Sequence, residues 1–289
     1  MAQEDVPKPL MALLAPLLGI PALLIVAFAI RTLFVGRALP PDQLAPLLGQ
    51  PRVSTIFRAG QGDAGAVGPD AGMDLGPGGE VVIRWKQGLT SVQRGALLKA
   101  PDPAMGSFAV NGDGLVMAVR GRRLAYMRSG ALTESFDLPA PDLRLERLGP
   151  DRMALYGKTG EKLWSVFALG KGGRYAKLFT FPFEISALAA ADNGLIFASA
   201  GAIYHVAFGS RVLPLLHLST AAPIRSLAYD GARKAVFFST ADAVYVFGRG
   251  RRRKILDKVS GTLRWEKDAL FVLSDARQEL LRIDGIFAK

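Results

Sequence analysis

The sequence of 289 residues contains no cysteine and only two histidines. The absence of cysteine excludes a disulfide scaffold, a cysteine-ligated metal site and a thiol nucleophile. The shortage of histidine removes the commonest metal ligand and the commonest acid–base group at neutral pH. Acidic residues are also scarce, because 36 Lys and Arg stand against 25 Asp and Glu and leave a net charge of +11.

Charged side chains are absent from an apolar run of 21 residues at positions 10 to 30. As a helix with a rise of 1.5 Å per residue, this run would reach about 31 Å, roughly the thickness of a hydrocarbon core. We therefore predict a single-pass transmembrane helix over residues 10–30, between a short tail at 1–9 and a linker at 31–52. The residues that mark this anchor along its length are Leu10, Leu17, Leu24 and Ile30.

A cleaved signal peptide is the alternative reading of this run. It is disfavoured because the run is longer than the usual apolar region of a signal peptide, and because Glu4 and Asp5 make the leader acidic. Basic residues flanking the run favour a cytoplasmic body by a small margin. Analogy with single-anchor bacterial chains that carry an all-β body favours the opposite side, and we expect an extracytoplasmic, periplasmic domain while the cytoplasmic orientation stays open.

From Glu80 onward the chain consists of short apolar runs separated by Gly, Asp and Asn, a pattern typical of an all-β protein. The clearest unit extends from Ile185 to Val206 and reads as three strands, with a tight turn at Asp192-Asn193-Gly194. The same pattern recurs along the chain, and the second strands are expected to begin near Val81, Leu115, Met153, Leu195, Ala235 and Ala269.

The spacings between these strand starts are 34, 38, 42, 40 and 34 residues. Six similar units of short antiparallel strands predict an all-β, six-bladed β-propeller of four-stranded blades over residues 53–289. A β-sandwich is the alternative, but it would not produce a series of similar units. The last unit has room for only three strands, and we expect residues 53–58 to supply its fourth, outer strand and so close the ring.

The unit from Ile185 to Val206 resembles the repeats of NHL-type and gluconolactonase-like propellers. It shares their turn between the first two strands and an aromatic third strand that contains Ile203 and Tyr204. Enzymes of the gluconolactonase-like group bind a divalent metal in the central channel through Glu, Asn and Asp. This resemblance implies a fold rather than an activity.

No catalytic or metal-binding set matches that pattern in this chain. The two asparagines, Asn111 and Asn193, both fall in predicted hairpin turns, where asparagine is favoured because it tolerates left-handed backbone angles. We therefore expect no metal, no other cofactor and no catalytic residue, and we treat an enzymatic role as open but disfavoured.

A dense basic segment is the strongest charge feature of the sequence. It is predicted to form a loop between the third and fourth strands of the fifth unit, and it consists of Arg249, Arg251, Arg252, Arg253 and Lys254. Such a loop could attract anionic lipid headgroups. Nucleic acid is a weaker candidate because no aromatic residues are interleaved to stack on bases.

These features together predict a membrane-anchored, non-enzymatic scaffold or accessory subunit that binds other subunits of a larger membrane complex. Two alternatives stay open. One is a metal-dependent lactonase or hydrolase with its site in the channel. The other is a sensor for a small ligand or glycan that uses Trp85, Trp164 and Trp265.

Overall fold

The computed structural model describes residues 49–58, 72–76, 79–85, 88–91, 97–98, 106–128, 131–149, 151–209, 212–218, 222–248 and 250–287. The predicted tail, the predicted anchor with Leu10, Leu17, Leu24 and Ile30, and the linker up to residue 48 lie outside the described residues. Within the described part of the chain, no helix has both the length and the apolar character that a membrane crossing requires.

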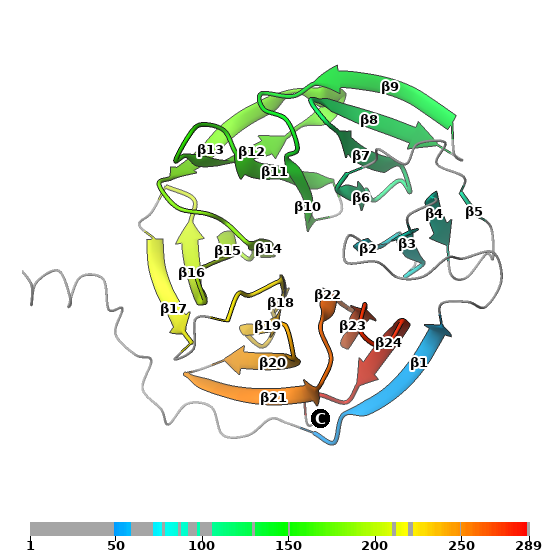
Figure 1. The fold of residues 1–289 in the computed structure, drawn as a ribbon, viewed down its shortest axis with the longest axis vertical. Helices are drawn as coiled ribbons and strands as arrows, with labels where there is room; N and C mark the ends of the chain where they lie inside the picture. The colour runs from blue at the N-terminus through cyan, green and yellow to red at the C-terminus, as the bar shows by residue number, and fades with distance from the viewer. Residues whose placement is uncertain are drawn as a thin grey trace, which may run out of the picture. The chain divides into compact units, whose positions relative to one another are not determined.

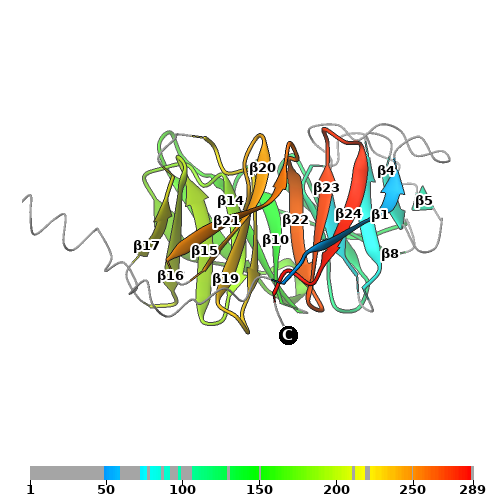
Figure 2. The same ribbon diagram turned by 90° about the horizontal axis from the view of Figure 1, so that it is seen from below.

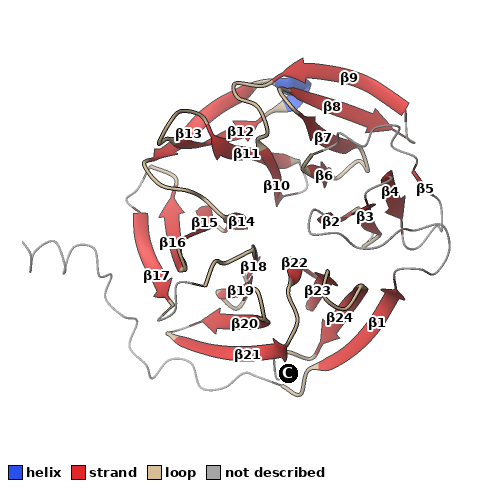
Figure 3. Ribbon diagram, viewed as in Figure 1, coloured by secondary structure: helices blue, strands red, loops and turns tan. Residues whose placement is uncertain are grey.

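The described chain folds into four-stranded antiparallel sheets that are arranged radially around a central axis (Figure 1). Apart from one short 3-10 turn, η2 (Lys171–Gly173), the regular elements of the described residues are strands (Figure 3). This arrangement is a β-propeller with four-stranded blades. From the side, the sheets stand next to one another around the ring (Figure 2).

The first three sheets are numbered along the chain from the innermost strand outward. They are β2 (Gly72–Leu75), β3 (Val81–Trp85), β4 (Gly88–Ser91) and β5 (Leu97–Leu98); β6 (Phe108–Val110), β7 (Val116–Arg120), β8 (Arg123–Arg128) and β9 (Ala131–Asp137); and β10 (Arg144–Gly149), β11 (Arg152–Lys158), β12 (Trp164–Leu169) and β13 (Tyr175–Phe181).

The other three sheets follow the same inside-to-outside order. They are β14 (Ala187–Ala191), β15 (Gly194–Ser199), β16 (Ala202–Ala207) and β17 (Val212–His217); β18 (Ser226–Asp230), β19 (Ala235–Ser239), β20 (Ala243–Gly248) and β21 (Arg251–Asp257); and β22 (Gly261–Glu266), β23 (Ala269–Ser274), β24 (Glu279–Asp284) and β1 (Arg52–Arg58).

The hydrophobic core lies between neighbouring sheets rather than at the axis. In the described residues it forms six clusters, and each cluster combines side chains of two adjacent sheets. The second strands of the sheets are the most deeply buried, as in β15 (Gly194–Ser199), where every residue is buried. This explains why the sequence shows continuous apolar runs at these strands instead of a simple alternation.

The ring closes through strand β1, which pairs antiparallel with β24. Arg52 lies opposite Asp284 and Arg58 opposite Glu279, with a register shift between Thr55 and Phe57. Phe57 packs against the cluster between the first and last sheets. The pairing expected for residues 53–58 is therefore present, and the last sheet combines strands from both ends of the described chain.

One sheet is smaller than the sequence pattern indicated. Five sheets have outer strands of six or seven residues, whereas the outer strand of the remaining sheet, β5, has two. Pro101 and Pro103 follow β5 in the sequence, and proline cannot donate a hydrogen bond to a ladder. The propeller thus has five full four-stranded sheets and a reduced one.

Candidate functional site

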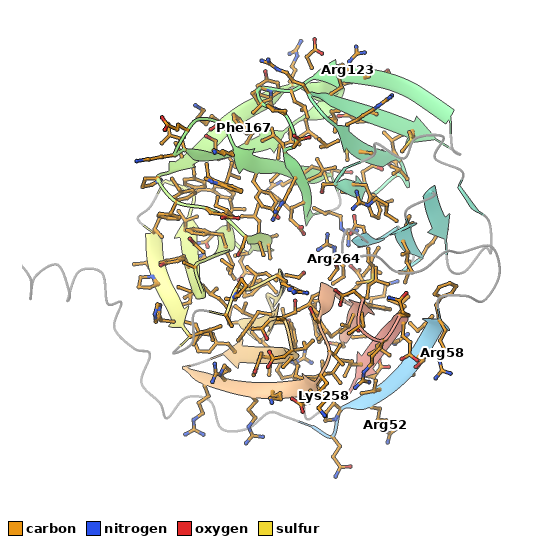
Figure 4. All side chains as sticks on the ribbon, in the orientation of Figure 1. Arg52, Arg58, Arg123, Phe167, Lys258 and Arg264 are labelled. Carbon is orange, nitrogen blue, oxygen red and sulfur yellow. The ribbon has the colours of Figure 1, made fainter. Side chains whose placement is uncertain are left out.

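Charged side chains gather where three of the innermost strands approach the axis. They come from β2, β10 and β22, and Figure 4 shows Arg264 pointing into the middle of the ring. We call them the central ion network, which consists of Asp74, Glu146, Arg147, Arg264 and Glu266. The other three innermost strands carry small residues at comparable places, namely Ala109, Ala189 and Ala228.

Arg264 is the hub of this network. Its Nε lies 3.1 Å from Oδ1 of Asp74. Its Nη1 and Nη2 lie 3.2 and 3.3 Å from the two carboxylate oxygens of Glu146, the two-pronged geometry that suits a guanidinium. Because β22 and β10 belong to sheets on opposite sides of the ring, the pair of Arg264 and Glu146 spans the channel (Figure 1).

Arg147 makes a second connection across the axis. Its Nη2 lies 3.3 Å from Oε2 of Glu266, and its Nη1 donates a 2.8 Å hydrogen bond to the carbonyl of Leu75. Its Nε is 3.8 Å from Oδ1 of Asp74. Two arginines therefore share one buried aspartate, and both reach from one sheet to another.

Asp74 is fully buried and uses both carboxylate oxygens. Oδ1 faces the two arginines, while Oδ2 accepts a 2.7 Å hydrogen bond from the backbone N–H of Val110 on β6. A single carboxylate thus joins the sheets of β2, β6, β10 and β22. A buried charge with this many partners is stable only while all of them stay in place.

The burial of Glu146 changes its proton affinity. Desolvation raises the pKa of Glu146 to about 7, against the lowering effect of Arg264. Burial alone would lower the pKa of Arg264, but Glu146 and Asp74 raise it overall, so its guanidinium stays charged. The network therefore contains one permanent cation at its hub and one carboxyl that exchanges its proton near neutral pH.

The chemistry of the network differs from that of a channel metal site. Among the described residues, no group of three or more His, Asp or Glu side chains is placed to hold a metal ion. The guanidinium of Arg264 instead lies between the carboxylates of Asp74 and Glu146, where it supplies the positive charge that they face.

The asparagines lie in turns, as the sequence predicted, but for another reason. Asn111 Oδ1 accepts hydrogen bonds from the backbone N–H groups of Asp113 and Leu115. Neither Asn111 nor Asn193 has a positive φ. The expected left-handed backbone is therefore wrong, and Asn111 is favoured because its side chain closes the turn.

Two of the three tryptophans pack between blades. The ring of Trp265 stacks on Phe237 with centroids 4.7 Å apart, and Trp164 packs against the cluster between the third and fourth sheets. This is the packing role of an aromatic residue in a core.

The predicted basic loop is not a loop. Arg251, Arg252, Arg253 and Lys254 form the first four residues of the outer strand β21, and all four are exposed. Arg249 lies outside the described residues, and the turn before the strand contains Gly250 with φ of 79°. The prediction assigned these four residues to the loop before the strand, because four consecutive charges are not typical of a strand.

The central ion network was missed by the sequence reasoning, although the sequence contains a signal for it. Asp74, Glu146 and Arg264 each follow an apolar residue inside the first strand of a unit, where other units have alanine or another small residue. Charges at repeat positions that face the axis lie close to the innermost strands of other repeats, so they predict ion pairs between repeats.

The comparisons with known proteins find likeness in structure only. No protein-family model matches the sequence, and no curated protein sequence gives a significant match. A gluconolactonase from Xanthomonas campestris has a TM-score of 0.60 at 14% identity, with 82% of this chain and 90% of that chain covered. Virginiamycin B lyase from Staphylococcus aureus has a TM-score of 0.57 at 10% identity, with coverages of 81% and 99%.

A third neighbour is a chain of a mitotic checkpoint complex, with a TM-score of 0.53 at 11% identity and coverages of 74% and 76%. The identities are too low to carry an activity, so these likenesses show the fold alone. The resemblance to gluconolactonase-like propellers that the sequence indicated is therefore confirmed for the fold.

Proposed function

We propose that this chain is a membrane-anchored, non-enzymatic propeller that acts as an accessory subunit or scaffold of a larger membrane complex. One observation carries the proposal: the channel is bridged from wall to wall by its own ion pairs. The axis then serves to hold the blades together, and the outer surface serves to bind. In this proposal all six sheets, including the reduced one, act as blades.

The membrane part of the proposal is supported by the sequence. The apolar run at residues 10–30 has the length of a spanning helix, and a linker separates it from the propeller in the sequence. We propose a single pass with the propeller on the extracytoplasmic, periplasmic side. The third structural neighbour indicates that a related fold takes part in a multisubunit assembly, which supports the scaffold role by analogy only.

The test is isolation of the full-length chain from its native membrane in mild detergent, followed by mass spectrometry. We expect other membrane proteins to co-purify in fixed proportion. A matched variant, Leu17→Lys with Leu24→Lys, should abolish membrane retention and the co-purification together. A chain that purifies alone from the wild-type membrane would contradict the scaffold role.

An enzyme with its site in the channel is the second candidate. Glu146 favours it, because a carboxyl with a pKa of about 7 suits a general acid. Elemental analysis and a lactone hydrolysis assay on wild type and Glu146→Gln separate the two functions. We expect no stoichiometric divalent metal and no difference in hydrolysis, whereas turnover that Glu146→Gln abolishes would favour the enzyme.

A further inference from the structure

The outer strands of the propeller differ sharply in charge around the ring. Strand β21 contains four basic residues and one acidic residue, and β1 contains two basic residues and none that is acidic. Strand β9 contains two acidic residues, Glu134 and Asp137, and no basic one. Figure 1 shows β9 and β21 on opposite sides of the ring, and Asp137 of β9 lies 3.6 Å from Arg123 of the neighbouring strand β8. The basic charge of the outer strands is therefore concentrated on the side of β21 and β1.

The basic residues of β21 and β1 are exposed and mostly not used in ion pairs. Arg251, Arg253 and Arg52 form no ion pair with the described residues, and each is exposed. Two of the six basic residues are paired: Lys254 Nζ lies 2.7 Å from Asp257 Oδ1, and Arg58 Nε lies 2.8 Å from Glu279 Oε1. The guanidinium of Arg252 lies over the ring of Tyr245. Most of this charge therefore faces the surroundings.

The arrangement of these charges suits a broad surface better than a pocket. Successive residues of a strand point to opposite faces of its sheet, so the four basic residues of β21 surround the sheet edge instead of lining one groove. Strand β1 continues the basic edge along the circumference (Figures 1 and 2). In Figure 4, Arg52 extends outward on this side.

The same side of the ring receives the chain from the predicted anchor. The backbone N–H of Gly49 donates a 2.9 Å hydrogen bond to the carbonyl of Ile286, and β1 begins three residues later. The predicted linker therefore joins the propeller next to β1, so β1 lies at the point where the tether of the proposed anchor is attached.

We propose that the basic face, which consists of Arg52, Arg58, Arg251, Arg252, Arg253 and Lys254, binds the anionic phospholipid headgroups of the bilayer. The inference rests on the proposed membrane anchor and adds an orientation, with the ring edge against the membrane. Each basic residue near an anionic bilayer strengthens binding about fivefold. A layer of many headgroups matches six charges spread along two strands.

The absence of cysteine from the chain makes a site-specific test direct. Full-length chains with the single substitution Ser54→Cys, on the exposed part of β1, are reconstituted into vesicles of phosphatidylcholine with or without one third phosphatidylglycerol. The measured quantity is the rate of maleimide labelling. Ala176→Cys, an exposed position on β13, is the matched control.

We expect phosphatidylglycerol to slow labelling at position 54 at least fivefold and to leave position 176 unchanged. Arg251→Gln, Arg252→Gln and Arg253→Gln together should restore fast labelling, while lysine at the same three positions should keep the protection. High salt should remove the protection in the wild-type background, since exposed charges are screened. Equal labelling in both vesicles would overturn the basic face as a lipid-binding surface.

The outcomes distinguish this proposal from the anchor on which it rests. Alkaline carbonate extracts the chain from vesicles if there is no spanning segment, whatever happens at position 54. A chain that resists extraction but shows no lipid-dependent protection has an anchor and no lipid-binding face. A single-stranded oligonucleotide is also added to the chain in vesicles of phosphatidylcholine alone. If the oligonucleotide protects position 54 and phosphatidylglycerol does not, the lipid assignment is overturned in favour of nucleic acid.

Discussion

The propeller uses arginine in two opposite ways, at its axis and at its circumference. Arg264 is largely buried between Asp74 and Glu146, whereas Arg251 and Arg253 lie exposed on an edge strand and form no ion pair with the described residues. The same residue type therefore stabilises the fold at the axis and is available for binding at the circumference. Burial and partners, rather than residue type, decide which role an arginine has.

Of the variants considered, replacement of Arg264 at the axis should have the largest effect on the free energy of unfolding. Arg264→Met is expected to lower the free energy of unfolding by about 3 to 5 kcal/mol, because Glu146 loses its paired cation and Asp74 keeps only the more distant Arg147. Urea unfolding of the full chain in detergent, followed by tryptophan fluorescence, measures the loss. Arg264→Lys keeps the charge but not the bidentate geometry, so its free energy of unfolding should lie between those of the wild type and Arg264→Met. A loss below about 1 kcal/mol would show that the network does not support the fold.

The raised pKa of Glu146 gives the next largest effect. In the unfolded chain this carboxyl titrates near 4.5, and in the folded chain near 7, so the folded state binds the proton more tightly. The stability that Glu146 contributes is therefore complete below pH 4.5 and is lost as the pH rises through 7, by at most about 3 kcal/mol.

Glu146→Gln removes this titration. Melting temperatures of wild type and variant, measured between pH 5 and pH 8, should diverge as the pH rises, with the wild type losing stability relative to the variant. Parallel curves would mean that Glu146 is already ionised throughout this range in the folded protein.

The propeller was predictable from the sequence because its signals are local. Turn residues separate apolar runs at a regular spacing, and the second strands begin within one residue of the expected positions from Val81 to Ala269. The pairing of β1 with the last sheet was predictable because the last unit of the sequence has room for only three strands. Each of these inferences needs only the pattern inside one unit or the comparison of two units.

The candidate site was not predictable in the same way. Arg264 and Glu146 are 118 residues apart in the chain, and their contact depends on two sheets facing each other across the axis. No spacing within a unit encodes that distance. Strand β21 was misplaced for a different reason. Its first four residues are exposed at the outer edge of the sheet, so they carry charges that are otherwise typical of a loop.

A smaller effect tests whether the circumference also contributes to stability where the ring closes. Phe57 on β1 packs against the cluster between the first and last sheets, while its neighbour Ile56 is 40% exposed at the register shift. Phe57→Ala should cost about 2 kcal/mol, below the range for a fully buried phenylalanine because the ring is only half-buried. Ile56→Ala should stay within about 0.5 kcal/mol. Equal losses in chemical unfolding of the two variants would contradict closure through Phe57.

The smallest effect is expected at the basic face. Replacement of Arg251, Arg252 and Arg253 by glutamine should change the free energy of unfolding by no more than about 0.5 kcal/mol, since the side chains are exposed and make no ion pairs with described residues. Self-repulsion between neighbouring charges even favours a slight gain. The variant is measured by the same urea unfolding as Arg264→Met. If the triple variant loses no stability while Arg264→Met loses several kcal/mol, the basic face is not needed for folding and binding is left as its role. A large loss of stability in the triple variant would instead show that this edge stabilises the ring.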